Sequence, residues 1–252
     1  MTSNRYLFRD WKLSSIVAGF LPFAIQNAFL LFLVAGGEYV NTIIFYLFPL
    51  VFAIIFAGVI GWSNFIDALG FDVTNRKILL KAVAFGVGVG LMMYVVGQLA
   101  NIKIIPYAEH FAIAFSEAQP NVNPSLKIAY TIVFMFLVAL GEEIICYIAM
   151  ATTANWLLQR GFTEQQALIL GAVLSRTVWG FTHWASWNFL GIPVEAIIAS
   201  IITSVIVGVS LFTWGGLILY EYGVKEYLIY APLLAHFVYN TLVTMRVFGI
   251  VP

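Results

Sequence analysis

Residues 125–159 read SLKIAYTIVFMFLVALGEEIICYIAMATTANWLLQ, an apolar stretch that is compatible with a helix over its whole length. Its apolar residues are continuous and do not alternate with polar ones, which favours a helix over a strand. At a rise of about 1.5 Å per residue this helix would measure roughly 50 Å, longer than a hydrocarbon core of roughly 30 Å. The stretch therefore predicts a membrane-spanning helix that tilts or projects, and it carries two adjacent acids, Glu142 and Glu143.

The rest of the chain has the same apolar character. Of its 252 residues, 62% are apolar, 16% aromatic and 10% charged, and the mean hydropathy is +0.96. This composition excludes an ordinary soluble globule, and the absence of short alternating segments excludes a membrane β-barrel. Twelve basic residues balance twelve acidic ones without a basic stripe, so no nucleic-acid partner is expected. Cys146 is the only cysteine, which excludes an intrachain disulfide and a cysteine metal site.

Polar, glycine and proline clusters divide the chain into seven expected spans in one integral membrane domain, residues 1–252. The expected spans are residues 14–35, 41–62, 78–100, 125–159, 163–187, 193–220 and 226–248. A break at Gly215-Gly216 would raise the number to eight, and residues 104–119 predict an amphipathic segment at the interface. Glycines at 86, 88 and 90 permit close helix contact. The sequence thus predicts an all-α, polytopic transmembrane helix bundle of seven to eight spans.

The distribution of basic residues predicts the orientation of this bundle. With seven spans, eight basic residues lie on the side of the N-terminus and three on the other side. The first group comprises Arg5, Arg9, Lys12, Arg76, Lys77, Lys81, Arg160 and Lys225, and the second Lys103, Lys127 and Arg246. Because basic residues are enriched in cytoplasmic loops, this bias predicts a multi-pass protein with a cytoplasmic N-terminus and a retained first span.

Six polar residues fall at membrane depth, where a charged group costs about 2.5 to 3.5 kcal/mol on insertion scales. They are Glu142, Glu143, Arg176, His183, His236 and Asn240. Glu142 lies 19 residues before Gly161 and His183 lies 22 residues after it, so an antiparallel hairpin would bring both to one level. Adjacent glutamates are about 100° apart on a helix, so we expect one to face a common site and the other to bond a neighbour. Arg176 is the expected counter-ion of the acids.

Three short motifs within this set resemble a known family. Residues Glu142–Tyr147, Trp179–His183 and His236–Asn240 are similar in order and spacing to the three motifs of the CPBP, or Abi, intramembrane proteases, which include CAAX prenyl endopeptidases. The resemblance covers about residues 125–245, and we take residues 125–248 as the motif-bearing core. Two positions depart from the family pattern. Tyr147 stands where the first motif has arginine, and Trp179 stands where the second has phenylalanine. We expect Arg176 to supply the missing charge.

The resemblance implies an intramembrane endopeptidase that cleaves a membrane-associated peptide or protein, with a prenylated CAAX peptide as one option. It implies that Glu142, as general base, and His183 activate water, while His236 and Asn240 stabilise the tetrahedral intermediate. Glu143 belongs to the same catalytic set. Two histidines and a carboxylate also make a zinc shell, so a metal-dependent form with Glu142, His183 and His236 as ligands stays open beside a metal-free one.

Other interpretations of the same residues stay open. The acids could form a structural ion pair, and the histidines with Asn240 could join helices by hydrogen bonds. Tyr147 is interpreted as a packing residue. An inert scaffold or bacteriocin-immunity protein of the same fold would keep the cluster without chemistry, and a transporter would use it as an ion relay. A haem protein would use His183 and His236 as axial ligands, but it would leave the paired acids unexplained.

Overall fold

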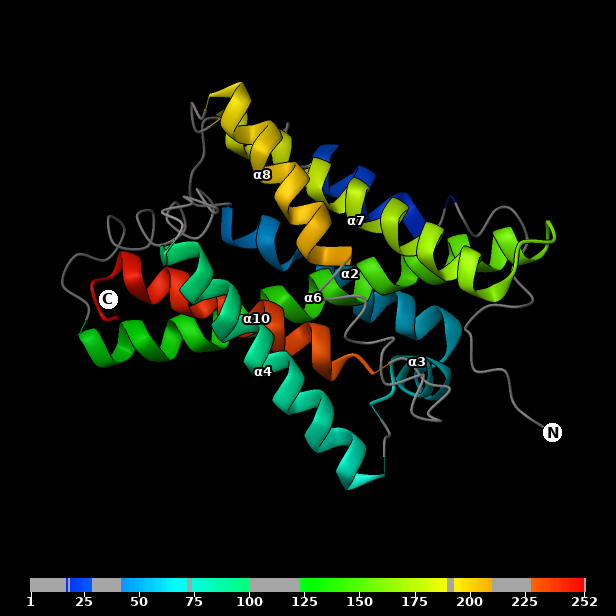
Figure 1. The fold of residues 1–252 in the computed structure, drawn as a ribbon, viewed down its shortest axis with the longest axis horizontal. Coiled ribbons are helices and arrows are strands. Elements are labelled where there is room, and N and C mark those ends of the chain that lie inside the picture. Colours follow the sequence, from blue (N-terminus) through cyan, green and yellow to red (C-terminus); the bar gives the residue numbers. More distant parts are fainter. Residues whose placement is uncertain are drawn as a thin grey trace.

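The computed structural model describes residues 17, 19–28, 42–71, 74–99, 123–189, 193–209 and 228–251. Helices and turns make up these residues, with no strand among them, and the predicted all-α class is confirmed (Figure 1). The expected interfacial segment, residues 104–119, and the expected break at Gly215-Gly216 lie outside the described residues. Of the expected first span, residues 19–28 are described and are helical.

Helices α2, α3 and α4 form the first half of the described bundle. They comprise Thr42–Ile60, Trp62–Leu69 and Arg76–Leu99. The expected second span, residues 41–62, agrees with α2, but the short helix α3 was not predicted. Gly61 separates the two helices because its φ of 93° is a conformation that glycine adopts without strain and that cannot continue an α-helix.

Helices α6 and α7 form an antiparallel pair whose ends agree closely with prediction. The helix α6 is Pro124–Leu158 and α7 is Glu164–Phe189. Asn123 caps α6 by accepting a hydrogen bond from the Ser125 amide at 2.8 Å. Gly161, at φ 85°, ends the turn that follows α6. Thr163 and Gln166 then bond each other's backbone amides reciprocally, at 3.3 and 3.1 Å, which confirms the predicted start of α7.

Helices α8, Val194–Val207, and α10, Tyr230–Val247, complete the described fold. The predicted start of the last span at Glu226 is wrong, because residues 228–229 lie outside the helix and α10 begins at Tyr230. Pro232 gives the physical reason. Proline is tolerated in the first turn of a helix but removes a hydrogen bond further inside, so a helix starting near 226 would be interrupted at this residue.

Helix α6 passes through the middle of the molecule (Figure 1). It packs against α2, α7 and α10, while α4 packs on α10 and α8 packs on α7. Residues 141–155 of α6 are all buried, so this part of the helix is enclosed on every side. The two glutamates begin this enclosed segment and therefore meet side chains from several helices at once.

Two of the four glycines on α4 allow α10 to approach closely. A Cβ at Gly86 would lie 2.6 Å from the carbonyl oxygen of Ala231, and one at Gly90 would lie 2.7 Å from that of Ala235. Both distances are shorter than real contacts, so only glycine fits. A Cβ on Gly88 would meet nothing within 4 Å. The close contact within this chain therefore uses Gly86 and Gly90, spaced by four residues on one helix face.

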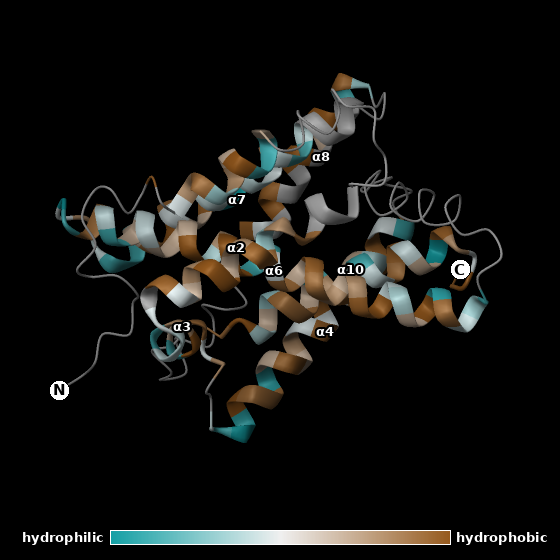
Figure 2. Cartoon of the chain, turned by 180° about the vertical axis from the view of Figure 1, so that it is seen from behind, coloured by the Kyte–Doolittle hydropathy of each residue, from teal (hydrophilic) through white to brown (hydrophobic). Residues whose placement is uncertain are grey.

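Two described helices, α4 and α6, are long and apolar enough to span a membrane. Hydrophobic residues, drawn in brown, occur along α2 and α4 (Figure 2). Large apolar side chains are exposed on several helices. They include Val51, Ile54, Ile55 and Val59 on α2, Leu91, Met92, Val95, Val96 and Leu99 on α4, and Ile198, Ile202 and Ile206 on α8. These faces are unusual for a protein surface in water.

Candidate active site

Side chains from α6, α7 and α10 meet around the two glutamates. The helix α6 supplies Glu142 and Glu143, α7 supplies Arg176, Trp179 and His183, and α10 supplies His236 and Asn240. Six of these seven side chains belong to residues that are almost completely buried, and His183 is partly buried. The structure thus links five of the six polar residues that the sequence analysis selected, Glu142, Glu143, Arg176, His183 and His236, and it adds the indole of Trp179. Among the described residues, the side chain of Asn240 makes no hydrogen bond to them.

The carboxylate of Glu143 has partners on both oxygens. Arg176 donates from Nη1 to Oε1 at 3.0 Å and from Nη2 to Oε2, so the ion pair is bidentate. His236 Nδ1 lies 2.9 Å from Oε1 as a further donor. Glu143 is 0% and Arg176 1% exposed, so solvent does not screen the pair. The guanidinium therefore takes the place expected for it, as counter-ion of one of the two acids.

A glycine makes room for the Arg176 side chain. A Cβ on Gly208, in the π-helical residues that directly follow α8, would lie 2.8 Å from Cδ of Arg176. Any larger residue at this position would press on the aliphatic part of the arginine. The end of α8 thus covers the ion pair, a role for Gly208 that nothing in the sequence indicated.

The carboxylate of Glu142 is bound differently. The indole N–H of Trp179 donates to Oε2 at 3.0 Å, and His236 Nε2 lies 3.6 Å from the same oxygen. Within the part of the chain that the structure describes, Oε1 of Glu142 accepts no hydrogen bond. Glu142 therefore has neither a bidentate partner nor a guanidinium, and one of its oxygens is available for a further proton donor.

Both histidines have their Nδ1 atoms directed at an oxygen. Nδ1 of His183 lies 2.9 Å from the carbonyl oxygen of Trp179, which can only accept, so Nδ1 carries the proton. Nδ1 of His236 likewise donates to the Glu143 carboxylate. A neutral ring held in this way carries its lone pair on Nε2, which is the arrangement found in histidines that exchange protons or bind metals.

The ring of Trp179 is the centre of this cluster. It makes edge-to-face contacts with His183 and His236, with ring centroids 5.2 and 5.6 Å apart. The Arg176 guanidinium carbon lies 5.4 Å from the centroid of the indole. Trp179 is 7% exposed. One aromatic ring therefore contacts both imidazoles and the guanidinium that binds Glu143.

Asn240 lies one turn beyond His236 on the same face of α10 and is 4% exposed. Its backbone carbonyl accepts a hydrogen bond from the Thr244 hydroxyl at 2.8 Å. Among the described residues its side-chain amide makes no hydrogen bond. Asn240 is thus as buried as His236, four residues before it, but its side chain is not hydrogen-bonded to the network.

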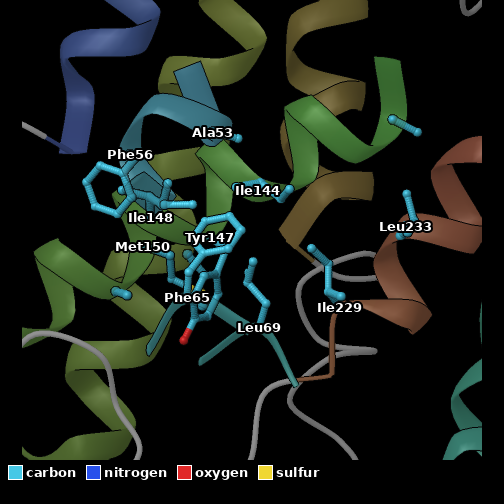
Figure 3. Packing of buried hydrophobic residues seen from close by; sticks show 14 residues of the cluster. Ala53, Phe56, Phe65, Leu69, Ile144, Tyr147, Ile148, Met150, Ile229 and Leu233 are labelled. Carbon is cyan, nitrogen blue, oxygen red and sulfur yellow. The ribbon is translucent and has the colours of Figure 1, made fainter. Parts of the chain in front are cut away.

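Tyr147, at the position of the motif arginine, belongs to a different part of the molecule. It is 4% exposed and lies in a cluster of apolar residues that includes Phe65 and Leu69 of α3 (Figure 3). This placement agrees with its interpretation as a packing residue. Because Arg176 contacts Glu143 from α7, the position of Tyr147 does not leave that glutamate without a cation.

Within the described residues, no group of three or more His, Cys, Asp or Glu side chains is arranged to hold a metal ion. The three residues named for a zinc form, Glu142, His183 and His236, therefore do not form such a group here. Comparisons of the chain with protein-family models, with curated proteins and with solved structures found no match, and the site is interpreted from its own geometry.

Proposed function

We propose that this protein is an intramembrane endopeptidase that uses Glu142 to activate water against a peptide bond and His236 to stabilise the oxyanion that forms. The observation that carries the proposal is the buried pair formed by Glu142 Oε2 and His236 Nε2, 3.6 Å apart, next to a glutamate already neutralised by arginine. This separation is longer than a hydrogen bond, and an approach of about half an ångström would bring the carboxylate and the imidazole within reach for direct proton transfer.

The different bonding of the two glutamates assigns their roles. Glu143 accepts from Arg176 through both oxygens and from His236, so most of its acceptor sites are occupied and its charge is neutralised, which makes it a poor base for water. Glu142 accepts one hydrogen bond from Trp179 and keeps Oε1. Glu142 is therefore the general base, and Glu143 orients His236 as the second carboxylate behind it.

The charges of the four buried ionisable groups favour one proton shared between Glu142 and His236. Arg176 cancels the charge of Glu143, so the Glu142–His236 pair is neutral overall when it holds one proton. A neutral network is strongly favoured at a buried site. With that proton on His236, Glu142 is an ionised base and His236 Nε2–H is a donor, which are the two groups that water attack on a carbonyl requires.

The reaction then follows from these positions. Glu142 takes a proton from water as its oxygen bonds to the scissile carbonyl carbon, and the resulting oxyanion accepts a hydrogen bond from His236. Glu142 returns that proton to the leaving nitrogen as the C–N bond breaks, giving a new carboxyl and a new amine. By the family resemblance, His183 orients the water and the Asn240 amide is a second oxyanion donor.

The apolar outer faces support a location in the bilayer. Exposed aliphatic residues on α2, α4 and α8 are suited to lipid tails, and two helices have the length of a span. We assign the chain seven to eight spans with a cytoplasmic N-terminus, as its basic residues predict. The substrate is a membrane-associated peptide or protein, with a prenylated CAAX peptide as the class that the resemblance implies.

The main rival is an inert scaffold or immunity-type protein of the same fold. The loss of the motif arginine at Tyr147 favoured that interpretation, because it would leave a glutamate without its partner. The bidentate contact from Arg176 removes this argument. A transporter that relays protons through Glu142 and His236 is the other rival, and both are outcomes of the following test.

The test compares new protein N-termini by mass spectrometry in membranes that contain the wild type or Glu142→Gln at matched levels. Glu195→Gln is the matched control, because Glu195 is an exposed acid in the first turn of α8. Termini that require Glu142 but not Glu195 support a protease and identify its substrates. Identical termini in all three samples, with the proteins folded, contradict the proposal. Proton flux that depends on Glu142 would then indicate a transporter, and its absence a scaffold.

A further inference from the structure

We propose that Trp179 is a positioning residue that holds the Glu142 carboxylate through its indole N–H. The inference rests on the proposed function, because it assigns a role in orienting the general base. The phenylalanine usual at this position of the motif has no hydrogen-bond donor and could not perform it. The exchange of phenylalanine for tryptophan in this chain is therefore a functional change instead of a neutral one.

The hydrogen bond itself is the first argument. Trp179 Nε1 lies 3.0 Å from Glu142 Oε2, and both residues are buried. Indole nitrogen is only a donor, so the direction of this bond is certain. A donor to an ionised carboxylate makes a stronger bond than a neutral pair does, particularly away from water. The bond fixes Oε2 and directs the remaining oxygen of Glu142 away from the indole.

The ring of Trp179 adds a second constraint. It makes edge-to-face contacts with both His183 and His236, and its backbone carbonyl fixes the proton of His183 on Nδ1. A single residue thus contacts the base and both imidazoles. Its displacement would disturb the three groups together, while loss of its N–H alone would release only Glu142.

The position of Trp179 on α7 explains both departures from the family motifs. Arg176 and Trp179 are three residues apart and share one helix face. Arg176 binds Glu143 and Trp179 binds Glu142, so α7 supplies one donor for each glutamate. Tyr147 on α6 is then free to pack among apolar residues. In this chain the donors for the acid pair come from α7.

A purely structural role for Trp179 makes a different prediction. The residue also packs in an apolar cluster with Phe23, Ile145 and Cys146. If packing were its whole role, an aromatic side chain of the same shape without the N–H would be sufficient. Benzothienylalanine, in which sulfur replaces the indole N–H, makes this distinction at position 179. Trp179→Phe is the genetically encoded counterpart, and Trp62→Phe on an exposed residue of α3 is the control.

The first measurement observes the hydrogen bond without any substrate. In full-length protein labelled at tryptophan and held in lipid nanodiscs, Trp179→Phe identifies the Trp179 signal among the seven indole N–H signals. We expect this signal to move upfield in Glu142→Gln, where the acceptor loses its charge, and further in Glu142→Ala. It should not move in Glu195→Gln. A signal that is identical in wild type and Glu142→Ala overturns the proposal.

The second measurement follows the appearance of termini that depend on Glu142. Benzothienylalanine at position 179 should lower their rate at saturating substrate by at least about tenfold, the effect of one lost hydrogen bond to a charged group. Trp62→Phe should leave the rate unchanged. Full activity of the benzothienylalanine protein overturns the proposal. If the wild type forms no such termini, the proposed function fails, and the NMR result alone decides whether Trp179 holds Glu142.

Discussion

Replacing Arg176 with methionine removes the bidentate partner of a carboxylate that has no exposed surface. Glu143 would keep its contact with His236 Nδ1 but lose both hydrogen bonds from the guanidinium. Methionine fills a similar volume and leaves the contact with Gly208 unstrained. The substitution therefore tests the ion pair and not the packing around it.

The expected cost follows from the two bonds that are lost. A hydrogen bond to a charged group contributes about 1.5–3 kcal/mol, so two of them give about 3–6 kcal/mol. Removal of one partner from a buried ion pair typically costs about 3–5 kcal/mol. Because His236 stays in contact and Glu143 can take up a proton, we expect the free energy of unfolding to fall by about 3–5 kcal/mol.

The assay is a denaturant titration of the protein in detergent micelles, followed by tryptophan fluorescence, with the free energy extrapolated to zero denaturant. Arg160→Met is the matched control. Arg160 is exposed, stacks on Trp156 and donates to its carbonyl at 3.0 Å, so its loss should cost less than about 1 kcal/mol.

A double-mutant cycle with Glu143→Gln separates the pair from other effects. Glu143→Gln alone leaves the guanidinium buried without its carboxylate and should cost about as much as Arg176→Met. The double variant should be more stable than the sum predicts by at least about 2 kcal/mol. Additive costs, or a cost of less than about 1 kcal/mol for Arg176→Met, would refute the reasoning.

Three further predictions concern the fold. Gly90→Ala should lower the free energy of unfolding by about 1–3 kcal/mol, because its Cβ would lie 2.8 Å from that of Val238. Gly88→Ala, whose Cβ would meet nothing within 4 Å, should be neutral or slightly stabilising. Equal effects of the two substitutions in denaturant titrations would contradict the α4–α10 contact. Tyr147→Arg should lower the melting temperature, since it replaces a buried aromatic ring with a charged side chain. A stabler protein in thermal melts would contradict this. Cysteines at Ser125 and Arg160, near opposite ends of α6, should react with a membrane-impermeant maleimide from opposite sides of the membrane; labelling of both from one side would contradict the topology.

Helix ends set by local signals could be predicted from the sequence. Asn123 and Pro124 start α6, and Thr163 with Gln166 starts α7, because caps and prolines act over a few residues. The two errors have the same origin in overlooked local signals. Gly61 separates α3 from α2, and Pro232 places the start of α10 at Tyr230.

The membership of the site was predictable, but its pairing was not. Arg176 and His183 are seven residues apart, and His236 and Asn240 four, so helical spacing alone puts each pair on one helix face. Which glutamate meets the arginine depends on how α6 is rotated, and distant backbone contacts set that rotation. A Cβ on Gly141 would lie 2.5 Å from the Leu50 amide nitrogen, so α2 fixes α6 directly beside the acids. No local pattern encodes such a contact.

The two acids differ in their hydrogen-bond partners, and this difference is the strongest argument against a purely structural cluster. An ion pair that only joins helices needs one carboxylate for one guanidinium, and Glu143 with Arg176 satisfies that need completely. Glu142 is then an additional buried acid, whose cost to stability Trp179 and His236 reduce but do not cancel with a fixed positive charge. Buried ionisable residues of this kind typically mark functional sites, and Glu142 lies beside a hydrogen-bond donor and an imidazole, the neighbours that proton transfer by a carboxylate requires. The geometry of Glu142, more than the number of polar groups, therefore favours chemistry at this site.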